Sequence, residues 1–167
     1  MTQQTTDTDR IEPLLEESIE IAASPATVWA LVSDVARMSS WSPQVVRTVV
    51  RGRPVQQGTR FYNLNRRGPL FWPTQAMVVA CEPHRRFAFR IKENWTVWSF
   101  TLEPTAEGGT RLTERREAPK GISGVSRGLT RLALGGQQVF TAELREGMRE
   151  TLARIRAEAE ARRTDPA

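Results

Sequence analysis

Two charged residues stand in a segment whose pattern predicts a strand with one buried face. The segment GTRLTERREAP spans residues 109–119, and Leu112, Glu114 and Arg116 share one side because side chains alternate along a strand. If Leu112 faces the interior, a carboxylate and a guanidinium group lie among apolar side chains. An unpaired charge there is expensive, so pairing or hydrogen bonding is expected.

Glu114 admits two interpretations. In one, it forms an ion pair with a neighbouring arginine at the end of the sheet. In the other, it anchors a ligand hydroxyl or carbonyl group, or acts as a general acid or base whose pKa is raised by burial. Asn63 and Asn65 also leave two alternatives open: they hydrogen-bond a ligand, or they cap local backbone, as asparagines beside turns usually do.

Several familiar catalytic and cofactor sites have no matching motif in this sequence. It holds no glycine-rich phosphate loop, no G-x-S-x-G nucleophile elbow and no His, Cys and Asp spacing suited to a metal. His84 lies in a Pro-His-Arg-Arg turn, where a surface role is expected, and Cys81 ends a strand, where a small apolar filler is expected. We therefore expect no metal and no cofactor, and Glu114 is the candidate catalytic residue.

A run of predicted strands positions these residues. Turn signals separate six strand-like segments, which span 44–52, 58–68, 72–83, 85–94, 95–104 and 109–119. A further strand is predicted over 17–23, followed by a helix that begins at Ser24-Pro25 and a short helical stretch over 35–41. Consecutive strands joined by short turns usually pair antiparallel, so the segments predict a meander that can curl around a long element.

A long amphipathic helix is predicted over residues 135–163. Its apolar residues recur at steps of three and four and so share one face: Phe140, Leu144, Met148, Leu152, Ile155 and Ala159. Gly147 borders this stripe, although a glycine inside a helix costs about 1 kcal/mol relative to alanine. Either Gly147 is tolerated in close helix–sheet packing, or it keeps volume open or lets a strand or ligand approach the helix closely.

Five ordered segments resemble one known family. They are IEIAASPATVWALVSDVARMSSWSP, GTRFYNLNRRGPLFWP, CEPHRRFAFRI, WSFTLEPTAEGGTRLTE and LREGMRETLARIRAEAE. Together they resemble the polyketide cyclase/dehydrase-like proteins of the SRPBCC, or START-like, superfamily over residues 17–161. The resemblance implies an α+β helix-grip fold: a curved antiparallel sheet of about seven strands wraps a long C-terminal helix, two short helices follow the first strand, and a cavity lies between sheet and helix.

A cavity of this kind predicts a binding role. We expect a small, largely apolar ligand, lipid-like or polyketide-like, because its pocket is lined by aromatic and aliphatic residues with a few polar groups. The expected ligand-binding residues are Trp41, Phe61, Asn63, Asn65, Phe89, Trp98, Phe100, Glu114, Arg116, Phe140, Leu144, Gly147 and Met148. The alternative is a polyketide cyclase or dehydratase-like enzyme that uses Glu114 as acid or base.

The charge balance suggests a second alternative, a basic surface that binds nucleic acid or an anionic membrane. The chain has 24 basic and 19 acidic residues and a net charge of +5. The arginine doublets, such as Arg66-Arg67 and Arg162-Arg163, are spread along the chain, which favours a solvated surface. We therefore expect no specific nucleic-acid binding and no stable membrane association.

The length of 167 residues predicts one domain over 16–162, between a disordered tail at 1–15 and a short tail at 163–167. One cysteine excludes an internal disulfide, and no apolar run has the length of a signal peptide or a membrane span. A cytoplasmic location and a monomer or homodimer are expected.

Overall fold

The computed structural model describes residues 12–118 and 137–164 and contains one curved antiparallel sheet. Its seven strands are β1 (Leu14–Ile21), β2 (Val45–Arg51), β3 (Arg60–Arg67), β4 (Leu70–Glu82), β5 (Arg86–Ile91), β6 (Val97–Pro104) and β7 (Thr110–Glu117). The order in the sheet is β1-β7-β6-β5-β4-β3-β2, so strands two to seven form a meander and β1 closes onto β7. The predicted antiparallel meander is confirmed.

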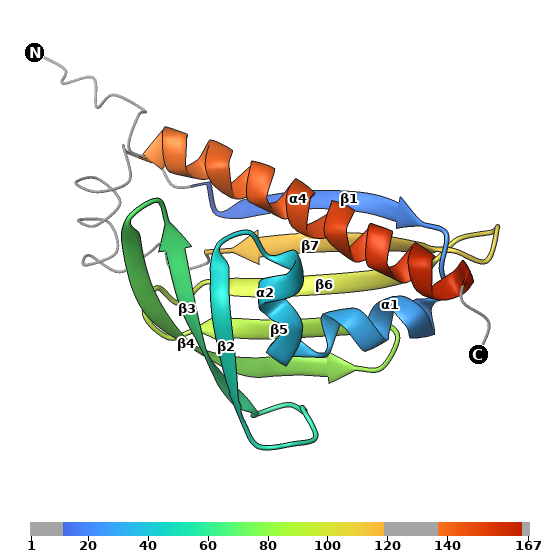
Figure 1. Ribbon diagram of the computed structural model, residues 1–167, viewed down its shortest axis with the longest axis horizontal. Helices are drawn as coiled ribbons and strands as arrows, with labels where there is room; N and C mark the ends of the chain where they lie inside the picture. Colours follow the sequence, from blue (N-terminus) through green and yellow to red (C-terminus); the bar gives the residue numbers. More distant parts are fainter. Residues whose placement is uncertain (1–11, 119–136, 165–167) are drawn as a thin grey trace, which may run out of the picture.

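Register shifts help the sheet to curve. One lies between Val45 and Arg47 in the β2–β3 pairing, and another between Val78 and Ala80 in the β4–β5 pairing. An extra residue in one strand bends that strand and increases the local twist. Strands β2 and β3 therefore run at a steep angle to β5, β6 and β7 (Figure 1).

The helices lie where the sequence indicated. Helix α1 (Pro25–Val32) begins at Ser24, whose Oγ accepts a hydrogen bond from the Thr27 N–H at 3.2 Å. A 3₁₀ turn, η2 (Val35–Arg37), leads into the short helix α2 (Met38–Trp41). Helix α4 (Gln137–Thr164) packs along β1 and is accompanied by α1 and α2 (Figure 1). This arrangement is the expected helix-grip fold.

The ends of the domain differ from the predicted boundaries. Strand β1 begins at Leu14, three residues before the predicted strand start at residue 17, because Leu15 is buried against Leu144 and Met148 of α4. At the other end, α4 continues to Thr164. The rest of the two predicted tails, residues 1–11 and 165–167, lies outside the described residues.

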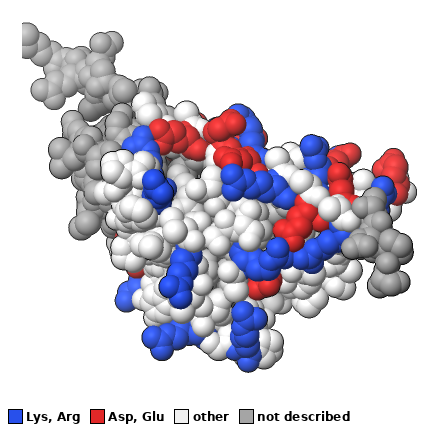
Figure 2. Space-filling view, viewed as in Figure 1, with Lys and Arg blue, Asp and Glu red and all other residues white. Residues whose placement is uncertain are grey.

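The charged side chains of α4 are largely paired. Figure 2 shows acidic and basic groups intermixed along this helix, and the ion pairs include Arg145 with Glu12, Arg149 with Glu17 and Arg162 with Glu158. None of the described helices is long and apolar enough to cross a membrane.

Candidate functional site

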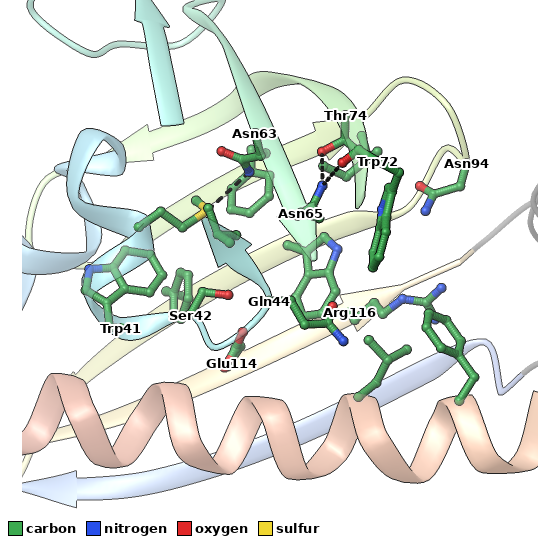
Figure 3. Close-up of a pocket in the computed structure, with 18 residues that line it drawn as sticks. Trp41, Ser42, Gln44, Asn63, Asn65, Trp72, Thr74, Asn94, Glu114 and Arg116 are labelled. Atoms are coloured by element: carbon green, nitrogen blue, oxygen red, sulfur yellow. Dashed lines mark hydrogen bonds between the residues drawn. The ribbon is translucent and has the colours of Figure 1, made fainter. Parts of the chain in front are cut away.

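A cavity of about 140 Å³ lies between the sheet and the first half of α4. Ten of its lining residues were expected from the sequence: Trp41, Asn63, Asn65, Phe89, Trp98, Phe100, Glu114, Arg116, Phe140 and Leu144. They come from α2, four strands and α4, so distant parts of the chain build one wall (Figure 3). The cavity is partly open to solvent.

The aromatic rings of the cavity wall pack edge to face. Trp41 contacts Phe100 with ring centroids 5.8 Å apart, and Phe89 contacts Phe61 at 5.2 Å. Edge-to-face contacts of this kind add to the stability gained from burial. Phe61 itself is fully buried in the core and does not line the cavity, so it supports Phe89 from behind.

Glu114 is buried in this wall and forms no ion pair with a described residue. It pairs in register with Phe100 of β6 and Glu17 of β1, and only 4% of it is exposed. Its Oε2 atom has no hydrogen-bond partner among the described residues. The interpretation of Glu114 as one half of an ion pair is therefore wrong for the described part of the chain.

Burial raises the pKa of the Glu114 carboxyl group well above its ordinary value, and the nearby carboxylate of Glu17 adds to the effect. Loss of water disfavours the charged form of an acid, and a second negative charge disfavours it further. Glu17 is held in place by Arg145 and Arg149 of α4. Glu114 is thus set up to carry a proton under conditions where an exposed glutamate is ionised.

Arg116 follows two residues later on the same face and is 5% exposed. Burial lowers its pKa to about 10, which leaves the guanidinium group charged at neutral pH. Its side chain forms no ion pair with any residue the structure describes. In Figure 3, Glu114 lies on the side of Ser42, whereas Arg116 extends toward the end of the cavity near Trp72.

The two asparagines lie within β3 and not at its turns. Asn63 accepts a hydrogen bond from Thr48 Oγ1 at 2.7 Å and directs its amide toward Met38 Sδ at 3.3 Å. Asn65 donates to Thr74 Oγ1 at 3.0 Å and to the Trp72 carbonyl at 3.3 Å. Neighbouring elements therefore orient both amides, and neither side chain caps a helix or a turn of its own strand.

Gly147 and Met148 line a second, smaller cavity of about 40 Å³ that shares Glu114, Leu144 and Trp98 with the first. A Cβ atom added at Gly147 would meet only Pro43 Cγ, at an ordinary contact distance of 3.7 Å. The close-packing interpretation of Gly147 is therefore wrong: the glycine borders open volume beside Glu114.

Eight lining residues were missed: Met38, Ser42, Gln44, Val45, Trp72, Thr74, Ile91 and Asn94. Cross-strand pairing offered a signal for two of them, because Trp72 and Thr74 stand opposite Asn65 and Asn63 in the β3–β4 hairpin. Ile91 shares a face with Phe89 by simple alternation. Ser42, Gln44 and Asn94 lie outside helices and strands, where the sequence has no periodicity from which the direction of a side chain could be predicted.

The part of the chain that the structure describes contains no candidate metal site, because no group of three or more His, Cys, Asp or Glu side chains is placed to hold an ion. Cys81 is partly buried, and burial raises the pKa of its thiol, which is the opposite of what an activated nucleophile needs. The polar chemistry of the cavity therefore rests on its amides, hydroxyls, Glu114 and Arg116.

The family model described as "Polyketide cyclase / dehydrase and lipid transport" matches residues 13–160. The chain belongs to this family. Among curated protein sequences, none matches it.

Solved structures share the fold. The di-domain aromatase/cyclase StfQ of the steffimycin biosynthetic pathway is 19% identical with a TM-score of 0.74, covering 92% of this chain and 52% of StfQ. The ZhuI aromatase/cyclase from Streptomyces sp. R1128 is 16% identical with a TM-score of 0.71, covering 89% of this chain and 94% of ZhuI. The chain thus spans about half the length of StfQ.

A third structure has a higher sequence identity. The polyketide-cyclase-like protein Cgl2372 from Corynebacterium glutamicum is 29% identical, with a TM-score of 0.58, and the match covers 90% of this chain and 93% of that protein.

Proposed function

We propose that this chain binds a small, largely apolar molecule, lipid-like or polyketide-like, in the cavity between the sheet and α4. The observation that carries the proposal is the buried Glu114 carboxyl group, which lines the cavity and has one oxygen without a hydrogen-bond partner in the part of the chain that the structure describes. Buried polar atoms in native proteins nearly always have a hydrogen-bond partner, so an exception in a cavity wall suggests that a ligand supplies it.

The cavity dimensions indicate what part of a ligand it encloses. An apolar cavity of about 150 Å³ engineered into another protein binds benzene, and the cavity here is close to that size at about 140 Å³. A ligand portion the size of one ring fits against Phe89, Trp98 and Phe100, and the open side admits the rest of a longer molecule.

The proposal is tested by native mass spectrometry for a co-purifying molecule and by titration with a neutral, environment-sensitive naphthalene dye. Leu144→Trp should fill the cavity from α4 and weaken dye binding about tenfold or more, equivalent to about 1.4 kcal/mol. Ala142→Trp, on the exposed side of the same helix, is the matched control and should bind like wild type. Unchanged dye affinity in a folded Leu144→Trp protein would exclude this cavity as the binding site.

A second candidate function is a cyclase or dehydratase-like reaction, favoured by the raised pKa of Glu114 in the cavity wall and by its Oε2 atom, which has no hydrogen-bond partner among the described residues. In a dehydration, the acid gives its proton to a hydroxyl group that leaves as water. The resulting carboxylate then takes the proton released from the neighbouring carbon, so the enzyme is restored. The test is an assay for loss of water from a small β-hydroxy ketone, in which the absorbance of the enone product is measured. Glu114→Gln should abolish this activity and should still bind the dye.

Binding to nucleic acid or an anionic membrane remains the third possibility, and the charge distribution argues against it. Several arginines of the described surface are neutralised by ion pairs with carboxylates, as in Arg37–Glu158, Arg111–Glu20 and Arg154–Glu150. Figure 2 shows the remaining basic groups of that face standing apart from one another. Dispersed arginines release few counterions together, so any affinity should disappear between low and physiological salt.

A further inference from the structure

We infer that the ligand of the cavity is an apolar acid whose carboxylate is bound by Arg116. This inference rests on the proposed function and adds the charge of the ligand to it. It follows from the position of Arg116, from the charges around the cavity and from the apolar character of the neighbouring walls.

Arg116 is a cation enclosed by apolar groups. Its partners in register are Trp98 of β6 and Leu15 of β1, and Phe140 and Leu144 of α4 line the same cavity. Moving a guanidinium group out of water without a counter-charge is energetically unfavourable. Since no residue that the structure describes forms an ion pair with Arg116, a partner inside the cavity would supply the missing counter-charge.

No described side chain of the cavity supplies that counter-charge. Among the lining residues only Glu114 and Arg116 are ionisable, and Glu114 forms no ion pair with Arg116. The next acid on the inner side, Glu17, is bonded to Arg145 and Arg149 instead. Burial favours the neutral form of Glu114, in which Arg116 carries the one charge among the described lining residues, and a ligand anion would neutralise that charge.

A carboxylate fits this position better than a neutral polar group. Arginine presents parallel N–H donors whose planar geometry matches the two oxygens of a carboxylate, and charge-assisted bonds of this kind are about twice as strong as neutral ones. A ketone or alcohol could accept a hydrogen bond from Arg116 but would leave its charge uncompensated. Phe89, Trp98 and Phe100 then hold the apolar body, and Glu114 meets a second oxygen of the ligand.

The test compares two probes of the same shape, para-ethylbenzoate, which is ionised at neutral pH, and para-ethylbenzamide, which is neutral. Protein-detected NMR titration measures both affinities. Wild-type protein should bind the acid about tenfold more tightly than the amide, the ratio expected for one charge-assisted hydrogen-bonded pair. Arg116→Met, which keeps the length but removes the charge, should lose that preference and bind the two probes about equally.

The matched control is Arg115→Met. Arg115 is the adjacent residue of β7, but it is exposed and paired with Glu16 on the outer side of the sheet, so its loss changes the net charge without touching the cavity. It should keep the wild-type preference for the acid. Should Arg116→Met fail to fold, as judged by circular dichroism, Arg116→Gln replaces it with the same expectation.

The outcomes separate the inference from the proposed function. If wild-type protein binds acid and amide equally, the cavity binds apolar molecules but the anionic ligand is wrong. If the acid preference survives in Arg116→Met, the carboxylate is bound elsewhere. If neither probe binds and the naphthalene dye does not bind either, the proposed function itself fails.

Discussion

The two halves of α4 carry the same apolar stripe but meet different surroundings. In the second half, Leu152, Ile155 and Ala159 join the main core together with residues of α1 and of the sheet, and all three are nearly inaccessible. In the first half, Leu144 and Met148 form a separate small cluster with Leu15, beside the cavity. The stripe therefore reports burial in both halves, but not whether the helix faces a filled core or a cavity.

The polar groups of the two ends differ in the same way. At the filled end, Thr110 donates to the Ala23 carbonyl at 2.8 Å, and Glu160 accepts from the Ala22 N–H at 2.9 Å. At the cavity end, Glu114 has an oxygen without a partner and Arg116 has no ion pair within the described chain. Unsatisfied buried groups destabilise a fold. The cavity end is therefore less stable than it would be with these groups bonded, and a ligand that bonds them would stabilise the protein.

The largest expected effect compares two leucines of the same stripe. Leu152→Ala should lower the free energy of unfolding by about 3 to 5 kcal/mol, because it loses apolar burial and leaves a void in a packed core. Leu144→Ala should cost about 2 kcal/mol, close to the transfer term alone, because it enlarges a cavity that already exists. Urea unfolding of both variants measures the difference. Equal losses would mean that the two halves of α4 are packed alike.

An effect of intermediate size is expected from Glu114→Gln, which keeps the shape of the side chain and removes its titration. The folded-state pKa of Glu114 lies above its unfolded value, so the folded protein holds a proton that the unfolded chain releases. Wild-type stability should therefore fall as pH rises from the unfolded value of about 4.3 up to the folded pKa, by up to about 1.4 kcal/mol for each pKa unit of the shift.

Glu114→Gln has no group that titrates at this position, so its stability should lack this pH dependence. The free energy of unfolding of the variant relative to wild type should be constant below about pH 4 and should rise with pH above it. The charged groups near Glu114 are Glu17 on β1, with its partners Arg145 and Arg149 on α4, and Arg116 on its own strand, and all four remain in both proteins. Urea unfolding of wild type and variant across a pH series provides the comparison. A difference that does not change with pH would show that Glu114 is not buried as described.

The smallest expected effect concerns Gly147, which borders the small cavity beside Glu114. Gly147→Ala should stabilise the protein by about 1 kcal/mol through helix propensity, since the added Cβ contacts only Pro43 at 3.7 Å. Thermal unfolding measures this gain, and a loss of stability would indicate close packing at this position. Gly147→Leu reaches further into the small cavity and should weaken dye binding, in contrast to the alanine variant.

Much of the fold follows from periodicity in the sequence. The alternation in residues 109–119 placed Leu112, Glu114 and Arg116 on one shared face, and the structure shows that this face is buried. The three- and four-residue spacing of the helical stripe likewise gave the buried face of α4. These features are local, because a regular backbone fixes the direction of each side chain relative to its neighbours in sequence.

The tertiary structure decided what those inward side chains meet. Periodicity placed Phe61 and Asn63 on the same face of β3, but packing put Phe61 in the core behind Phe89 and Asn63 in the cavity wall. It also left Glu114 and Arg116 without an ion pair to each other or to any other described residue, although they share a face of one strand. A strand fixes the side of the sheet on which a residue lies. Which partner the charged end of that residue reaches depends on the distance between sheet and helix, and long-range packing sets that distance.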